Sequence, residues 1–131
     1  MTKQTFSIDG AWDVELFYDV RPRDLHDVVD MMREEGATAE QIDEAWKNLQ
    51  GWNAGVTFSS FINRKSLVFI GRAEDALQFF NTIDHENDHV QAHVAMYYDV
   101  ELGTEEAAYL QGFIGGRVFA YVFNRLKLIE A

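Results

Sequence analysis

Between about Ala73 and Tyr98 the chain carries a long stretch of helical periodicity, and any fold of this chain has to accommodate it. Apolar residues recur there at spacings of three, four and their sums, which is the pattern of one face of an α-helix. These residues are Ala76, Phe80, Ile83, Val90, Val94 and Tyr97. Because such a face must be buried against other elements, the pattern predicts a helix on which the rest of a small domain packs.

The polar face of this helix contains His85-Glu86-Asn87-Asp88-His89, which has the form HExxH. Residues four apart on a helix lie on one face, so His85 and His89 can offer ring nitrogens to one metal ion at about 2.1 Å. Glu86 lies about 100° round the helix from His85, where its carboxylate can contact a water on the metal without ligating the metal. The spacing therefore predicts a divalent, zinc-type site with Glu86 as general base.

Catalytic zinc usually takes three protein ligands and leaves one position for water, so a third ligand is needed. His93 repeats the spacing of four, but a straight helix places it about 12 Å along the axis from His85, too far for one ion to bind all three histidines. We therefore expect His93 beside the site or on the surface. Asp99 and Glu101 lie in the short connection that follows the helix, and both stay open as ligands.

Glu105 and Glu106 begin a final helix that is predicted to run to about Phe123. Helical phase separates the two carboxylates, since Glu106 shares its face with larger side chains and Glu105 shares its face with small ones. The small residues are Ala108, Gly112, Gly115 and Gly116. A face of this kind can lie close against the histidine helix, so we prefer Glu105 as third ligand, with Glu106 as the alternative.

These segments resemble the zincin superfamily, and specifically the gluzincin branch, in which an HExxH helix is followed by a second helix that supplies a glutamate ligand. The stretch from Glu105 to Leu110 is similar to the ExxAYL stretch of small zincin-like proteins encoded by bacteria and their phages. The resemblance covers roughly residues 54–120. It implies one Zn²⁺ per chain, held by His85, His89 and Glu105, and a zinc-dependent hydrolase, in particular a peptidase acting on a peptide or protein substrate.

The resemblance also implies an α+β fold, a zincin-like minimal domain whose small antiparallel or mixed sheet packs against the HExxH helix and the glutamate helix. In that family an edge strand beside the HExxH helix pairs with an extended peptide, and Ser66 to Ile70 precedes the helix as such a strand should. Asn87 and Asp88 depart from the family pattern, in which these positions are often apolar. Asn87 points towards the packed side, where its amide needs hydrogen-bond partners.

Length and periodicity predict a single domain over residues 1–131. Residues 1–53 match no family pattern and are predicted to form a hairpin turning at Asp9-Gly10, followed by two helices that act as an accessory cover or an interface. The second helix begins with a capping box at Thr38 and Gln41.

Residues 54–131 form the predicted metal-site core. Apolar residues between Val56 and Ile62, and again between Leu67 and Ile70, predict two strands joined around Asn63-Arg64-Lys65. This hairpin precedes the histidine helix.

Composition excludes several kinds of site. The chain has no cysteine, so a metal must be bound by His, Asp or Glu. The net charge is −11 and the basic residues are scattered, which disfavours binding to a nucleic-acid backbone. The N-terminus lacks the pattern of a signal peptide, and no apolar run is long enough to cross a bilayer. We therefore expect a cytoplasmic protein without membrane association.

Two other functions are compatible with the sequence. A zincin-derived module, of the kind a phage encodes, would keep the metal for stability and act through protein contacts without catalysis. An acidic mimic of nucleic acid would occupy a basic protein, and this idea depends only on the charge of −11. Metal-dependent melting without hydrolysis would indicate the first, and absence of metal would favour the second.

Overall fold

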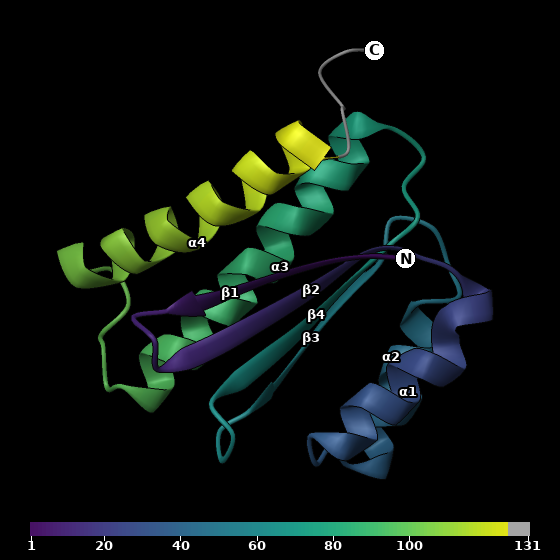
Figure 1. The fold of residues 1–131 in the computed structure, drawn as a ribbon, viewed down its shortest axis with the longest axis horizontal. Helices are drawn as coiled ribbons and strands as arrows, with labels where there is room; N and C mark the ends of the chain where they lie inside the picture. Colours follow the sequence, from purple (N-terminus) through teal and green to yellow (C-terminus); the bar gives the residue numbers. More distant parts are fainter. Residues whose placement is uncertain (126–131) are drawn as a thin grey trace.

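The computed structural model describes residues 1–125, and in this part of the chain helices cover both faces of a four-stranded mixed sheet (Figure 1). The fold is therefore α+β, as predicted. The strands are β1 (Thr2–Ile8), β2 (Trp12–Val20), β3 (Gly55–Ser60) and β4 (Lys65–Gly71). The helices are α1 (Leu25–Glu34), α2 (Ala39–Asn48), α3 (Ala76–Tyr97) and α4 (Glu105–Arg125), with a short 3-10 turn at Pro22–Asp24 ahead of α1.

The strands lie in the order β1-β2-β4-β3. β1 with β2, and β3 with β4, form antiparallel pairs, whereas β2 and β4 pair in parallel. The first hairpin turns at Asp9 and Gly10, as predicted, and both residues have positive φ. Because β4 is paired on both sides, the expectation that Ser66 to Ile70 forms a sheet edge is wrong. Parallel pairing with β2 covers that strand, and the edge beside α3 is β3.

Alternating side chains of the central strands build one hydrophobic core on each face of the sheet. Val68 and Ile70 of β4 pack in the core beneath α3 and α4. Leu67 and Phe69 pack in the opposite core, beneath α1 and α2. Burial on both faces explains why this strand reads as an uninterrupted apolar run. Figure 1 shows the two helix pairs on opposite sides of the sheet.

The first fifty residues supply half of the sheet and one of its two helical layers. The apolar stripe of α1 is buried. The helix α2 begins at the predicted capping box. Thr38 Oγ1 accepts a hydrogen bond from Gln41 N at 3.1 Å, and Gln41 Oε1 accepts one from Thr38 N at 2.8 Å. Ala45 of this helix and Leu49, the residue that follows it, join the core with Phe58 of β3.

The turn between β3 and β4 lies two residues earlier than predicted. β3 ends at Ser60, whose Oγ accepts a hydrogen bond from Asn63 N at 3.2 Å and so closes the turn. Phe61 and Ile62 therefore belong to the turn, and Ile62 is 95% exposed. The apolar character of these two residues does not extend the strand.

α3 and α4 lie side by side over one sheet face, and Gln91 Nε2 of α3 donates to Ala107 O of α4 at 2.9 Å. The face of α4 that is buried carries Ala107, Ile114, Val118 and Val122. A Cβ added at Gly112 or Gly116 would meet nothing within 4 Å, so the small-residue face does not pack against α3, contrary to expectation. Burying the face with the branched apolar side chains removes more apolar surface from water than burying the face with the small residues would. Within residues 1–125, no helix combines the length and apolar character needed to cross a bilayer.

Candidate functional site

His85 and His89 project from one face of α3, and their ring nitrogens converge. The two Nε2 atoms are 3.2 Å apart, and the ring planes are inclined by 81°. Two ligands that each bind one tetrahedral zinc ion at 2.0–2.1 Å stand about 3.3 Å from each other. The same separation also suits a hydrogen bond from a protonated to an unprotonated ring nitrogen. The predicted pair of histidines is thus brought together with the spacing that one ion requires.

Glu86 lies beside this pair but turns from the helix surface towards the sheet, and it is only 4% exposed. Thr57 Oγ1 donates to Glu86 Oε1 at 2.8 Å, and Glu86 Oε2 lies 4.0 Å from His85 Nε2. Gly55 makes room for the carboxylate, because a Cβ at that position would stand 2.8 Å from Glu86 Cγ. The structure therefore places a buried, hydrogen-bonded carboxylate next to the histidine pair.

A cleft of about 470 Å³ opens along β3, between α2 and α3. The strand residues from Gly55 to Ser59 form its floor, and the wall from α2 carries Gln41, Glu44 and Asn48. A second hollow of about 380 Å³ continues past Glu86 to Asn53. The wall from α3 carries His85, Glu86, His89 and His93. The histidine pair therefore lies in a groove that follows the edge of the sheet.

One face of β3 is specialised for contact with α3. Gly55 and Thr57 contact Glu86, and Ser59 Oγ lies 2.7 Å from His93 Nδ1. Val56 and Phe58 alternate with these residues and pack in the opposite core. The period-two separation of small or polar residues from apolar ones is visible in the sequence, but it does not say which helix the polar face will meet. These strand residues are not among the site residues predicted from the sequence.

His93 lies beside the histidine pair, as predicted from its distance along the helix. Its ring centroid is 6.3 Å from that of His89. The Ser59 hydroxyl that contacts His93 Nδ1 also lies 2.7 Å from Ser66 Oγ, and Trp12 Nε1 donates to Ser66 Oγ at 3.0 Å. Burial lowers the pKa of His93, and the nearby His89 lowers it further. Both effects favour the neutral imidazole.

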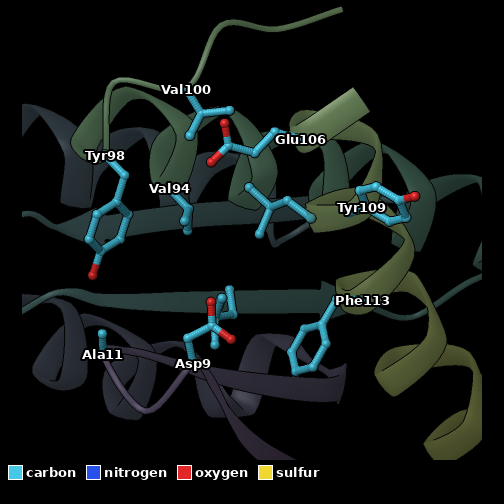
Figure 2. Close-up of a pocket in the computed structure, with 10 residues that line it drawn as sticks. Asp9, Ala11, Val94, Tyr98, Val100, Glu106, Tyr109 and Phe113 are labelled. Atoms are coloured by element: carbon cyan, nitrogen blue, oxygen red, sulfur yellow. The ribbon is translucent and has the colours of Figure 1, made fainter. Parts of the chain in front are cut away.

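Neither Glu105 nor Glu106 is brought to the histidine pair. α4 packs on the flank of α3 that carries Gln91, which lies about 120° round the helix from His85 at 100° per residue. Glu105 is exposed at the start of α4. Glu106 lines a separate pocket of about 600 Å³, across from Asp9 in the β1–β2 turn (Figure 2). The return of α4 along the far flank of α3 is the physical reason for this separation.

The donor set fits a zinc-type ion in part. His85 and His89 supply two nitrogens at the right spacing, and Glu86 supplies a neighbouring carboxylate. Asp99 and Glu101 are exposed in the connection after α3. Among residues 1–125, no group of three or more His, Cys, Asp or Glu side chains is arranged to hold a metal. Within this described part, neither Glu105 nor Glu106 joins the two histidines as the third ligand expected from the sequence.

Asn87 is buried at 1% exposure, which confirms that it points towards the packed side. Within the described part of the chain, neither its Oδ1 nor its Nδ2 has a hydrogen-bond partner, and the same holds for Gln111 Oε1. Asn87 thus remains a polar residue in a position where the zincin pattern is often apolar.

Comparison of the chain with protein-family models, with curated proteins and with solved structures found no match. The candidate site is accordingly defined by the geometry of His85, Glu86 and His89 and by the cleft around them.

Proposed function

We propose that this chain is a zinc-dependent hydrolase that cleaves peptides, with His85 and His89 as metal ligands and Glu86 as general base. The observation that carries the proposal is the convergence of the two Nε2 atoms at 3.2 Å beside a buried carboxylate. Both features face one cleft, which is where a substrate would have to lie.

Zinc bound at the two nitrogens would lower the pKa of a water molecule towards neutrality. Glu86 is suited to receive the proton of that water, because its Oε2 lies 4.0 Å from His85 Nε2 while Thr57 holds its Oε1. The carboxylate would then pass the proton to the amine that leaves. Over the whole reaction, the C–N bond breaks, the hydroxyl of the water adds to the carbonyl carbon to give a carboxylic acid, and the other proton of the water goes to the amine.

An extended peptide is the substrate class that the cleft favours. β3 is an edge strand of the sheet formed by residues 1–125, so within that range the backbone N–H and C=O groups along one side of it have no strand partner. A peptide can add to such an edge as a further strand, with α2 and α3 as the walls of the groove. The zincin resemblance implies a peptide in this kind of place, although here the edge is β3 and not Ser66 to Ile70.

The metal site is tested by elemental mass spectrometry on protein purified without a histidine tag. We expect about one zinc per chain in the wild type, as for a single tetrahedral site, and loss of zinc in His89→Ala. His26→Ala is the matched control, because His26 lies on α1 outside the cleft. A wild-type protein that stays free of zinc after zinc is added would contradict the proposal.

The catalytic role is tested with Glu86→Gln against a library of fluorescence-quenched peptides. We expect zinc to be retained and the hydrolysis rate to fall by about 10²- to 10⁴-fold, the usual contribution of a general base. Asp88→Asn removes the same charge from an exposed position on α3 and should leave the rate unchanged. Equal rates in Glu86→Gln and the wild type would exclude Glu86 as the base.

A second candidate function is a metal-binding interaction module without catalysis. It is favoured by the lack of a third ligand among residues 1–125 and by the hydrogen bond from Thr57 that occupies one oxygen of Glu86. Under this alternative, zinc raises the melting temperature and the wild type hydrolyses none of the library peptides. Because both functions include bound zinc, hydrolysis of the library peptides by the wild type is the result that separates them.

A further inference from the structure

Four side chains form a continuous chain of hydrogen bonds from the protein core to the cleft. Trp12 Nε1 donates to Ser66 Oγ at 3.0 Å, Ser66 Oγ lies 2.7 Å from Ser59 Oγ, and Ser59 Oγ lies 2.7 Å from His93 Nδ1. Trp12 and Ser66 are both 0% exposed. Because water does not reach this inner end, its polar groups have to be satisfied by one another.

The indole N–H of Trp12 can only donate, and this determines which atom donates in each of the following hydrogen bonds. Trp12 N–H can only donate, so Ser66 Oγ accepts from it. The buried Ser66 hydroxyl must then place its own proton on its other partner, Ser59 Oγ. Ser59 accepts that bond and donates its own proton to His93 Nδ1. The opposite direction would leave the Ser66 proton without an acceptor in the core.

This direction determines the tautomer of His93. With Nδ1 as acceptor, the ring is neutral and its proton is on Nε2. Within residues 1–125, Nε2 has no hydrogen-bond partner, and the ring lines the cleft between His89 and Phe61, with centroid separations of 6.3 and 6.0 Å. The Nε2–H group of His93 is therefore an available hydrogen-bond donor on a ring that lines the cleft beside the histidine pair.

We propose that His93 is a catalytic hydrogen-bond donor, whose Nε2–H binds the carbonyl oxygen of the substrate, and that Ser59, Ser66 and Trp12 are positioning residues that set its tautomer. The catalytic part rests on the proposed hydrolysis. As water attacks, the carbonyl oxygen gains negative charge, and a fixed neutral donor stabilises that charge without reorganisation. His93 transfers no proton in this step; it only donates a hydrogen bond.

The tautomer is tested by long-range ¹H–¹⁵N NMR of the histidine rings in protein as purified, a readout that requires no activity. We expect the proton of His93 on Nε2 in the wild type and a mixture of both tautomers in Ser59→Ala. Ser60→Ala is the matched control, because Ser60 Oγ accepts a hydrogen bond from Asn63 N and is not one of the hydroxyls that link Trp12 to His93. A proton on Nδ1 in the wild type, or an unchanged tautomer in Ser59→Ala, overturns the assignment.

The catalytic role is tested by comparing His93→Phe with His93→Gln on the same peptides. We expect kcat to fall by about 10²- to 10³-fold in His93→Phe with little change in KM, and part of the rate to return in His93→Gln, whose amide N–H reaches a similar place. An unchanged kcat in His93→Phe overturns the role. Lack of hydrolysis in the wild type overturns the proposed function and the role of His93 with it, while NMR still decides the tautomer.

Discussion

Gly55 of β3 lies so close to Glu86 of α3 that a Cβ at position 55 would stand 2.8 Å from Glu86 Cγ and 2.9 Å from Glu86 Oε2. Only a residue without a side chain permits this approach of strand and helix. Two residues further along the strand, Thr57 donates its hydroxyl hydrogen bond to the same carboxylate. One face of the edge strand thus makes room for Glu86 and also holds it in place.

Gly55→Ala is expected to destabilise the fold, because the new methyl group would also lie 2.9 Å from Thr82 Cγ2 and both neighbours belong to a packed helix. Overpacking of this kind costs about 1–3 kcal/mol. Urea unfolding measures the change. Gly51→Ala is the control, since a Cβ there would have Asn48 O as its nearest neighbour at 3.9 Å, and its effect should stay within about 0.5 kcal/mol. Equal stability of the two variants would show that strand and helix separate easily.

Thr57→Val keeps the shape of the side chain and removes the donor to Glu86 Oε1. A buried acceptor that loses its partner costs about 1–3 kcal/mol, so the midpoint of urea unfolding should fall. Thr5→Val makes the same chemical change at an exposed position of β1 and should have a much smaller effect. If both variants unfold at the same urea concentration as the wild type, the carboxylate does not depend on the hydroxyl of Thr57.

Glu105→Gln and Glu106→Gln are expected to retain zinc, in contrast to His89→Ala. The reason is that α4 packs on a flank of α3 about 120° round the helix from His85, with Glu105 exposed and Glu106 in the other pocket. Elemental mass spectrometry of the three variants side by side measures this. Loss of zinc in Glu105→Gln alone would show that Glu105 is the third ligand, as the zincin resemblance implies, and that the start of α4 moves to the site when metal binds.

Glu15 on β2 predicts a pH dependence of stability through its ion pairs with Lys3 and Lys65. Burial opposes ionisation, but the hydrogen bonds from the two lysines outweigh it and hold the pKa of Glu15 below its ordinary value of 4.5. Because the folded-state pKa is lower than the unfolded one, this stabilisation is complete above the ordinary value and is lost as the pH falls through the folded pKa.

Glu15→Gln should accordingly be less stable than the wild type at neutral pH, and the difference should shrink as the pH falls below 4.5. Urea unfolding at a series of pH values measures this. Glu40→Gln, at an exposed position of α2, should follow the wild type throughout. A difference between Glu15→Gln and the wild type that stays constant down to acid pH would mean that the ion pairs are not its source.

Turns, helix starts and helices could be predicted from patterns of residues that are close together in the sequence. The turn at Asp9 and Gly10, the capping box of Thr38 with Gln41, and the long helix that carries His85 and His89 all depend on residues within a few positions of one another. Such short-range signals act through backbone conformation and helix phase. The convergence of the two histidines is of the same kind, since a spacing of four on a helix is enough to bring their rings together.

The sequence by itself thus determined the helices, the hairpins and the histidine pair, whereas the strand order, the free edge at β3 and the flank on which α4 packs were decided only in the tertiary structure. Thr57 lies 29 residues from Glu86, and Ser59 lies 34 residues from His93. Contacts at such separations depend on which arrangement buries the most apolar surface on both faces of the sheet. The arrangement that does so depends on apolar residues from the whole chain together, so it cannot be predicted from any short sequence pattern.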